Sequence, residues 1–371
     1  MTAPRIWIAW ETQRRSLGLS RRLGADLRLV LHSGWKRYPL CIAETVALLA
    51  RCRGRTVFAQ NPSMVLAALA GLLKVPFGYR LVVDRHSNFA FLAGAGAGLK
   101  RRVSDLLSGF TLRRADLTLV TNSELQAHVE KAGGRAFVLP DPFPDLSAYQ
   151  PKVSRNEAPG SSGAAADASP RPREILFVSS WAFDEPISAA MQACRKLRGQ
   201  IIMRITGRPP AAWFQALAAA PVNFIPTGFL SEAEFFARMA ESDAVMAVTS
   251  RAATLVCGGY EGASLGKPLI LGGSAALREY FDAGCVYTDG SAADLEFRIR
   301  NLLTALPAYR EQIRAWLARR SKEWESRLEA LERALAGTPG FNPGSDRTHA
   351  PAGCEADAEA YAAGSAPAAR G

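Results

Sequence analysis

The stretch GYEGASLGKPLI, residues 259–270, is the most informative part of this 371-residue chain. A glycine pair, Gly258 and Gly259, lies at its start, and glycines can let the backbone pass close to a ligand. The pattern predicts a short helix from Tyr260, a glycine stop and then a buried strand over residues 269–271. A strand and a helix joined in this way indicate an α/β protein.

The start of this predicted helix contains groups that could bind a ligand. Its first turn presents backbone N–H groups without intrahelical partners, and such groups suit a diphosphate. Glu261 in this turn is an acceptor-only carboxylate, which can take hydrogen bonds from two neighbouring hydroxyls such as those of a ribose. Taken alone, the segment is also compatible with an ordinary helix–glycine–strand unit of another α/β protein.

Length and composition indicate two globular domains. Hydrophobic residues make up 48% of the chain and charged residues 21%, which fits a folded protein rather than a disordered one. Because the six cysteines are scattered without metal-ligand spacing, we expect neither a zinc site nor a disulfide framework, and a reducing cytoplasm is the natural location. No N-terminal signal is visible, and the longest apolar run, residues 64–73, is too short to span a bilayer.

The positive charge is concentrated in the first part of the chain. Residues 1–150 hold 21 Lys and Arg against 10 Asp and Glu, whereas residues 151–371 hold 24 of each. Such an excess of positive charge favours the binding of nucleic acid, anionic lipid or a phosphorylated substrate. It is also compatible with a generally basic background that has no functional meaning. No nucleic-acid-binding motif accompanies it, so we expect no nucleic-acid partner.

Strand and helix patterns alternate through both halves. The first half has predicted strands at residues 5–10, 26–32, 56–59, 79–83, 117–121 and 136–139, with helices at 42–51, 63–73, 99–109 and 123–132 (Ser123 as its cap). The second half has strands at 174–178, 201–205, 222–225 and 244–248, with helices at 187–197, 211–219, 232–241 and 296–335, the last broken near Pro307. This alternation predicts two parallel, doubly wound sheets.

Five regions follow from this pattern. We expect a Rossmann-like domain over residues 1–148, a linker rich in Pro, Gly, Ser and Ala over 149–173, and a second Rossmann-like domain over 174–305. Helices over 306–336 are expected to pack back on the first domain, and the Gly/Ala/Pro-rich tail 337–371 to be disordered.

Three polar segments follow predicted strands of the second half: SSWAFDE (179–185), TGRPP (206–210) and TSR (249–251). Open α/β sheets bind ligands at the carboxyl ends of their strands, so we expect these segments to share one cleft with Glu261.

The segment YEGASLGKP resembles the YE-x-x-x-x-GKP element of GT-B glycosyltransferases. In order and spacing, the segments VSSW…DE, ITGRPP and TGFLSEAEFFARMAESDAVMAVTS resemble the cytoplasmic β-mannosyltransferase of lipid-linked oligosaccharide synthesis and its bacterial relatives in polysaccharide assembly. The resemblance implies a GT-B glycosyltransferase, with two Rossmann-like domains facing a cleft and crossing helices at the C-terminus. It also implies a nucleotide-sugar donor in the second domain, held by Glu261, and a lipid-linked or saccharide acceptor in the first.

The predicted donor site has six further polar or glycine positions at strand ends. Ser179 and Ser180 offer hydroxyls and amides to phosphate oxygens. Arg208 offers a planar charged fork that can stabilise a leaving diphosphate, although it is also compatible with a solvated turn. Ser250 and Arg251 are weaker candidates, since a loop-forming serine or an arginine paired with an acidic neighbour would show the same pattern. The predicted donor-binding set is Ser179, Ser180, Gly207, Arg208, Ser250, Arg251, Gly258, Gly259, Tyr260 and Glu261.

One departure from the family pattern bears on stereochemistry. Retaining GT-B enzymes carry a glutamate eight positions before the one that corresponds to Glu261, and this chain has Ala253 there. The resemblance therefore favours an inverting reaction. A retaining relative without the first glutamate and a non-catalytic nucleotide-sugar-binding subunit are the alternatives.

An inverting transfer needs a base that takes the proton of the acceptor hydroxyl. Asp84 follows the predicted strand 79–83, and relatives have an acidic residue and a histidine at the places of Asp84 and His86. We expect Asp84 to be the base with His86 orienting it or sharing the role, while an N-cap or turn role for Asp84 remains open. Glu11 is the second candidate base.

The remaining acceptor-side predictions concern strand ends and one helix. Residues predicted to bind the acceptor are Arg14, Arg15, Ser16, Gln60 and Asn61. Residues 99–114 combine apolar and basic side chains at helical spacing, which suits either a membrane interface or a core-facing helix with a solvated basic edge. We expect a cytoplasmic protein, free or at the inner face of the membrane, that needs no metal and no cofactor beyond the nucleotide-sugar substrate.

Overall fold

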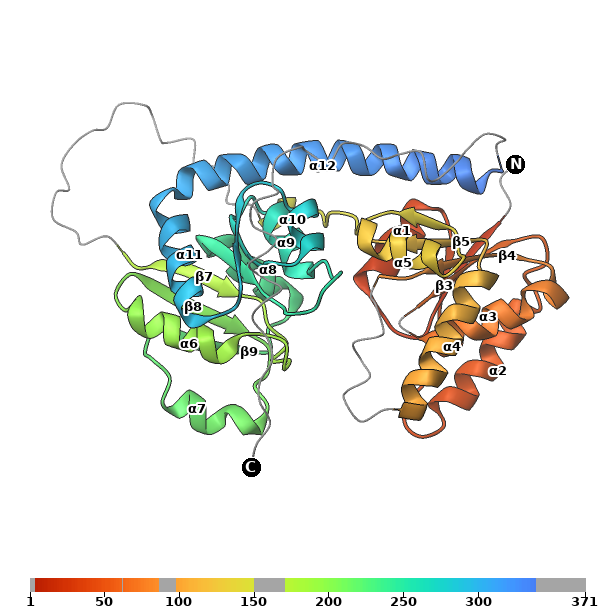
Figure 1. Cartoon of the computed structure of the whole chain (residues 1–371), viewed down its shortest axis with the longest axis horizontal. Helices are drawn as coiled ribbons and strands as arrows, with labels where there is room; N and C mark the ends of the chain where they lie inside the picture. The colour runs from red at the N-terminus through yellow and green to blue at the C-terminus, as the bar shows by residue number, and fades with distance from the viewer. Residues whose placement is uncertain (1–3, 62, 87–97, 150–170, 338–371) are drawn as a thin grey trace.

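The computed structural model describes residues 4–61, 63–86, 98–149 and 171–337. These residues form two lobes, each built on a six-stranded parallel sheet, and a long helix runs along both lobes (Figure 1). The strand orders are β2-β1-β3-β4-β5-β6 and β12-β11-β10-β7-β8-β9. The predicted α/β fold with two doubly wound, Rossmann-like domains is thus confirmed.

The first domain contains the N-terminal sheet. Its strands are β1 (Arg5–Ala9), β2 (Asp26–Leu29), β3 (Thr56–Gln60), β4 (Arg80–Asp84), β5 (Leu117–Val120) and β6 (Ala136–Val138). Its helices are α1 (Arg14–Arg22), α2 (Arg37–Leu49), α3 (Met64–Phe77), α4 (Gly98–Arg114) and α5 (Ser123–Lys131). The central strand β3 is buried at all five positions, as expected for a parallel strand covered on both faces.

The second domain contains the C-terminal sheet. Its strands are β7 (Arg173–Phe177), β8 (Ile201–Thr206), β9 (Phe224–Gly228), β10 (Ala244–Ala247), β11 (Leu269–Gly272) and β12 (Cys285–Thr288). Its helices are α6 (Ile187–Lys196), α7 (Phe214–Ala218), α8 (Glu232–Glu241), α9 (Cys257–Ser264), α10 (Ala275–Tyr280) and α11 (Ala292–Thr304). Short 3₁₀ turns, η2 (Ser147–Tyr149) and η3 (Ala211–Trp213), precede β7 and α7.

Two local predictions were wrong, and one strand was missed. The short helix begins at Cys257 and not at Tyr260, so the glycine pair lies inside its first turn. Helix α5 is capped by Asn122, whose side chain accepts a hydrogen bond from the Leu125 amide, and Ser123 is already helical. Strand β12 was not predicted at all, since its CVYT sequence is short and only alternately buried.

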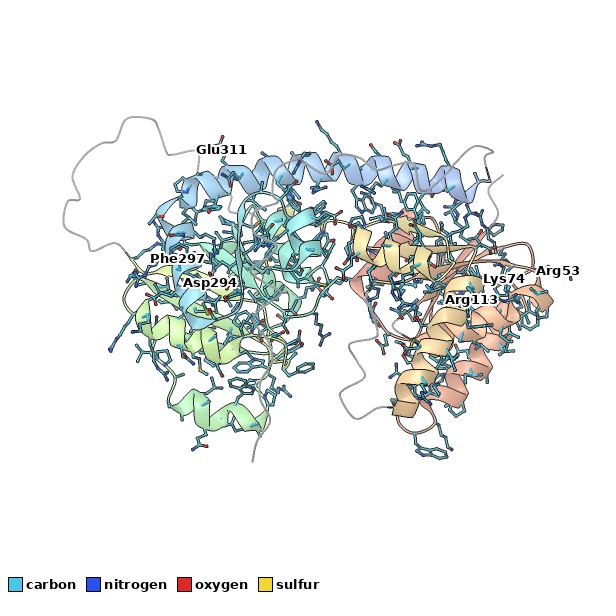
Figure 2. All side chains as sticks on the ribbon, in the orientation of Figure 1. Arg53, Lys74, Arg113, Asp294, Phe297 and Glu311 are labelled. Atoms are coloured by element: carbon cyan, nitrogen blue, oxygen red, sulfur yellow. The ribbon has the colours of Figure 1, made fainter. Side chains whose placement is uncertain are left out.

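Helix α12 (Leu306–Leu335) joins the two domains (Figure 1). Its Ile313 and Trp316 belong to an apolar cluster of the second domain, whereas Trp324 and Leu328 belong to a cluster of the first. Glu311 lies on the outer face of α12 and points away from the lobes (Figure 2). One helix therefore buries apolar side chains in both cores.

Two predicted segments lie largely outside the described residues: most of the linker 149–173, and all of the predicted tail 337–371 except Gly337. None of the helices that the structure describes is both long and apolar enough to cross a membrane.

The close approach of α12 to Gly284 gives a stability prediction. A Cβ at Gly284 would lie 2.5 Å from the backbone nitrogen of Ile313, and the φ of Gly284 is +72°. We expect Gly284→Ala to lower the free energy of unfolding by about 1–2 kcal/mol for the left-handed backbone and about 1–3 kcal/mol more for overpacking.

Gly290 provides a matched control, because its φ is +84° but its added Cβ would meet nothing closer than Pro186 Cβ at 3.5 Å. Urea unfolding of both variants measures the difference. Equal losses in Gly284→Ala and Gly290→Ala would contradict the close packing of α12.

Candidate functional site

The carboxyl edges of the two sheets face each other across a cleft. Arg14, at the start of α1, forms an ion pair with Glu261 of α9. Asn122, at the end of β5, donates a hydrogen bond to the carbonyl of Ala253 at 3.0 Å. Both contacts join loops at the strand ends of one sheet to loops or helix starts at the strand ends of the other.

Helix α9 places the predicted ribose-binding carboxylate at this cleft. Glu261 is buried, with its side chain 7% exposed. Burial raises the pKa of Glu261 above its ordinary value, while Arg14 opposes this shift and Glu232 adds to it. Desolvation is therefore the dominant effect on this carboxyl group, and a partner that donates hydrogen bonds would stabilise its charged form.

The glycines of α9 are packed closely against side chains of their own domain. A Cβ at Gly258 would lie 3.0 Å from Val178 Cβ, and one at Gly259 would lie 2.8 Å from the Phe281 ring. Tyr260 lies in the same core, where its ring contacts Tyr280 and Phe281. Close packing thus requires glycine at both positions, while the predicted approach of this pair to a ligand stays a prediction.

The strand-end segments of the second domain are brought together. The Ser179 amide donates to Thr206 Oγ1 at 3.0 Å, which joins the loops after β7 and β8. Asp184 pairs with Arg251 at 2.9 Å, which joins the loops after β7 and β10. Because Val178 also packs on Gly258, all four predicted segments meet at one edge of the sheet.

Glu185 is a residue of this edge that the sequence reasoning missed. Its carboxylate accepts hydrogen bonds from the Ser180 amide at 3.0 Å and from Ser180 Oγ at 2.9 Å, and Ser179 Oγ also donates to it. The hydroxyls predicted to bind phosphate are therefore bonded to an internal carboxylate. The spacing of Ser179 and Glu185 within one seven-residue loop could have indicated this pairing.

Arg208 differs from Arg251 in its surroundings. Arg251 is held by Asp184, whereas Arg208 is exposed and forms no recorded ion pair with the residues that the structure describes. Gly207 before it has a φ of +86°, and a Cβ there would lie 2.6 Å from the Ser179 carbonyl oxygen. Only glycine fits this turn, which directs the chain from β8 past the loop after β7.

Between the domains lies an open cavity of about 510 Å³. It is bordered by α1, the connecting segment 141–146, and helices α8 and α9. Arg14 reaches into it from the first domain, where it meets Glu232 at 3.4 Å as well as Glu261. Cationic side chains of the first domain thus face carboxylates of the second.

In the first domain, Asp84 is fully buried in a network of charged side chains. Arg15 donates from Nε to Asp84 at 2.8 Å and from Nη1 to Asp141 at 2.6 Å. Burial alone would raise the pKa of Asp84, but Arg15 and His86 outweigh it and hold this pKa below its ordinary value. A carboxylate in this state is a weak base.

His86 lies beside this network and is partly exposed. Its Nδ1 is 3.8 Å from Asp84 Oδ2, and neither atom has a hydrogen-bond partner among the described residues. The buried side-chain amide of Asn61 is likewise without a partner there, although its backbone N–H donates to the Asp84 carbonyl at 2.9 Å. Unsatisfied buried polar groups are rare in folded proteins, so their gathering around Asp84 marks a polar site.

The other predicted acceptor residues lie nearby. Glu11 pairs with Arg37 at 2.9 Å and is half-exposed, while its backbone carbonyl accepts a hydrogen bond from Gln60 Nε2 at 3.2 Å. The same Gln60 amide donates to Ser16 Oγ at 3.2 Å. Arg14 alone of this set is directed to the second domain, and its guanidinium is committed to carboxylates there.

The place of the missing glutamate is buried. Ala253 has a φ of +53° and belongs to an apolar cluster of the first domain that contains Val120 and Leu125. A glutamate side chain at this position would face these apolar residues. The loop after β10 thus packs against the first domain and presents no carboxylate at position 253.

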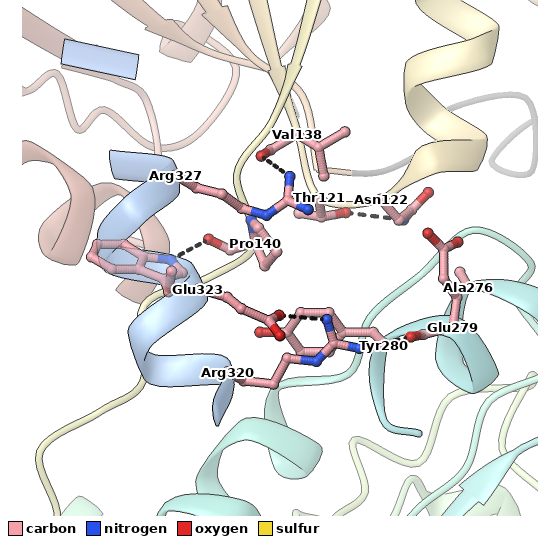
Figure 3. Close-up of a pocket in the computed structure, with 11 residues that line it drawn as sticks. Thr121, Asn122, Val138, Pro140, Ala276, Glu279, Tyr280, Arg320, Glu323 and Arg327 are labelled. Carbon is pink, nitrogen blue, oxygen red and sulfur yellow. Dashed lines mark hydrogen bonds and ion pairs between the residues drawn. The ribbon is translucent and has the colours of Figure 1, made fainter. Parts of the chain in front are cut away.

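A smaller cavity of about 60 Å³ lies where α10, α12 and the first domain meet (Figure 3). Arg320 of α12 pairs with Glu323 at 2.8 Å, and Trp324 Nε1 donates to the Pro140 carbonyl at 3.0 Å. Arg327 donates to the Val138 carbonyl at 3.3 Å. The polar groups that line this cavity are thus bonded to other groups of the protein. We regard the cavity as part of the connection between the domains.

Helix α4 and the segment before α2 carry exposed apolar side chains at the rim of the first domain. Leu106 is 72% exposed, next to exposed Arg102 and Val103, while the side chains of Leu99, Lys100 and Arg101 lie outside the described residues. Before α2, Trp35 is 86% exposed, and the Lys36 ammonium lies 5.0 Å from the centre of its ring. Apolar and basic side chains thus alternate on this rim.

No protein-family model matches the sequence, and no curated protein matches it. Solved structures do match the fold. HepE of Anabaena, in complex with UDP and glucose, aligns with a TM-score of 0.65 and 13% identity over 91% of this chain and 100% of that one. A glycosyltransferase of Rickettsia africae aligns with a TM-score of 0.59 and 12% identity over 90% of each chain.

The catalytic domain of starch synthase IV of Arabidopsis thaliana, bound to ADP and acarbose, aligns with a TM-score of 0.57 and 10% identity over 83% of this chain and 79% of that one. At such low identity the likeness concerns the fold. It confirms the two-domain architecture, with the sheets facing a cleft, that the sequence led us to expect.

The buried pair of Asp84 and Arg15 gives a pH-dependent prediction. Asp84→Asn should lower the free energy of unfolding at pH 7 by about 3–5 kcal/mol, since it leaves a buried guanidinium short of a charged partner. The pKa of Asp84 is lower in the folded protein than in the unfolded chain. The ionised carboxylate therefore makes its full contribution to the free energy of unfolding above the unfolded pKa of about 3.9, and this contribution is lost as the pH falls through the folded pKa. The difference in the free energy of unfolding between Asp84→Asn and the parent should therefore become smaller only at acidic pH.

Urea unfolding between pH 7 and pH 3 tests this, with Asp26→Asn as control because the Asp26–Arg28 pair is exposed and should contribute at most about 1 kcal/mol. A difference that stays constant down to pH 3 would contradict the assignment.

Proposed function

We propose that this chain, which has the GT-B fold, transfers a sugar from a nucleotide-diphosphate sugar to a hydroxyl of a lipid-linked or polysaccharide-precursor acceptor. The observation that carries the proposal is the buried Glu261 in the second turn of α9, facing an open cavity between two doubly wound domains. HepE and starch synthase IV, which share the fold, were solved with UDP and ADP bound.

The donor is assigned to the second domain. Glu261 would accept hydrogen bonds from the ribose hydroxyls, and backbone N–H groups at the start of α9 would bind the diphosphate. Arg208, exposed and without a recorded ion pair in the described chain, is the cation best placed among the strand-end segments to stabilise the leaving diphosphate. These groups support a transfer that does not depend on a metal ion.

Ser179 and Ser180 have a supporting role in this proposal. Their hydroxyls are bonded to Glu185, so they would hold the loop after β7 in place beside the donor. Asp184 pairs with Arg251 and in this way holds the loop after β10 in place.

The acceptor is assigned to the first domain, where we divide the roles of Asp84 and His86. Asp84 is buried, paired with Arg15 and low in pKa, which makes it a poor proton acceptor but a good partner for an imidazolium. His86 is partly exposed at the cleft edge, so it would take the proton from the attacking hydroxyl while Asp84 orients its ring. Glu11 would remain at the rim, paired with Arg37.

Inversion is the stereochemical outcome that the site supports. The position of the family's first glutamate is Ala253, which is buried against the first domain. A single displacement, with the acceptor attacking from the face opposite the diphosphate, needs only the base and the donor site.

The exposed apolar and basic rim supports a lipid-linked acceptor. Trp35, Lys36, Arg102 and Leu106 would bring the first domain to an anionic membrane surface, with the acceptor site at its edge. We therefore propose that the protein acts in the cytoplasm at the inner face of the membrane.

Glu261 gives the first test of the donor site. Glu261→Ala should weaken nucleotide binding at least tenfold, because hydrogen bonds to a charged group contribute about 1.5–3 kcal/mol each. Thermal shift with UDP, GDP and their sugars measures this against each variant's own baseline. Glu241→Ala serves as control, since Glu241 is exposed on α8 and pairs with Arg238. A Glu261→Ala variant stabilised like the parent would remove the donor assignment.

His86 gives the test of the chemical step. His86→Gln should keep the nucleotide-induced shift and lower the rate of sugar transfer by about 10²–10⁴-fold, as expected for loss of a general base. His32→Gln is the control, because His32 pairs with Glu44 on the surface. Unchanged turnover in His86→Gln would reassign the base, with Glu11 the next residue to test.

A further inference from the structure

Arg14 connects the two domains at the predicted ribose-binding carboxylate. It is the first residue of α1 in the first domain, yet its recorded contacts are with the second. Its Nη1 is bonded to Glu261 Oε1, its Nη2 lies 3.4 Å from Glu232 Oε2, and its Cζ lies 5.0 Å from the centre of the Phe236 ring.

Arg14 covers the carboxylate that a donor would need. The Glu261 side chain is 7% exposed with Arg14 in place, whereas the Arg14 side chain is 48% exposed. Among the described residues, Arg14 is the hydrogen-bond donor recorded for this carboxylate. Little of its surface is left for a ligand until the guanidinium withdraws.

Arg14 also has a place to withdraw to. Glu232 lies on α8 with its side chain 73% exposed, and the Phe236 ring provides a flat apolar surface one turn further along the same helix. A guanidinium can leave Glu261 and still keep a carboxylate and an aromatic ring as partners. The two carboxylates therefore offer alternative positions for one cation.

We infer that the Arg14–Glu261 pair is an internal competitor for the donor: the ribose hydroxyls replace the guanidinium, so Arg14 sets donor affinity and couples donor binding to the contact between the domains. This inference rests on the proposed role of Glu261 as the ribose ligand. It moves Arg14 from the acceptor set predicted from sequence to the control of the donor site.

The test compares a nucleoside with its diphosphate. Removing a cation weakens binding of any phosphate through simple electrostatics, so uridine isolates the competition for Glu261. Arg14→Gln should bind uridine at least threefold more tightly than the parent in calorimetric titrations, with guanosine used if GDP gives the larger thermal shift. Arg51→Gln is the control, since Arg51 is exposed just after α2, does not line this cavity and forms no ion pair in the described part of the chain. Its uridine affinity should match that of the parent.

A second measurement needs no ligand. A double-mutant cycle of Arg14→Gln and Glu261→Gln in urea unfolding should be non-additive, because the two side chains form a direct pair. Additive effects, or weaker or unchanged uridine binding in Arg14→Gln, would overturn the inference. If neither the parent nor Arg14→Gln binds any nucleoside or nucleotide, the donor assignment itself fails, and a non-additive cycle would then show that the pair only joins the domains.

Discussion

The attachment of helix α12 to both domains is the constraint on which the rest of the structure depends. Trp316 packs in the core of the second domain, and Trp324, two turns later, packs in the core of the first. A helix of this length is stiff, so these two anchors set the separation and orientation of the sheets. Asn122 and Ala253 can meet across the cleft because α12 brings the carboxyl edges of the two sheets into opposition.

The start of α1 distributes charge between the two halves of the cleft. Arg14 and Arg15 are successive residues, and successive side chains on a helix point in directions about 100° apart. Arg15 therefore turns inward to Asp84 and Asp141 on the side of the first domain, while Arg14 reaches Glu261 and Glu232 of the second domain. One helix start thus neutralises both the buried acid beside His86 and the carboxylate assigned to the donor.

Internal partners occupy much of the polar chemistry that the sequence had suggested for ligands. Ser179 and Ser180 bind Glu185, Arg251 binds Asp184, and the glycines of α9 fit against Val178 and Phe281. Such contacts preorganise the loops at the strand ends, as the proposed binding of a flexible nucleotide-sugar would require. Fewer polar groups remain available to a ligand among the residues that the structure describes: Arg208, His86, the side chain of Asn61 and the exchangeable Arg14–Glu261 pair.

The sequence by itself determined the two doubly wound domains, since buried parallel strands such as β3 require continuous apolar runs and the helices between them require helical periodicity. It also determined that Glu261 lies near a helix start and Asp84 at a strand end, because both follow local patterns. Strand β12 and the start of α9 were not predicted from the sequence. Both are short segments with weak periodicity, and their structure is set by their neighbours in the sheet. Only the tertiary structure decided which charges meet: Arg14 with Glu261 over 247 residues and Arg15 with Asp84 over 69 residues of chain. Electrostatic pairing depends on distance in space, and no local pattern in the sequence encodes that distance.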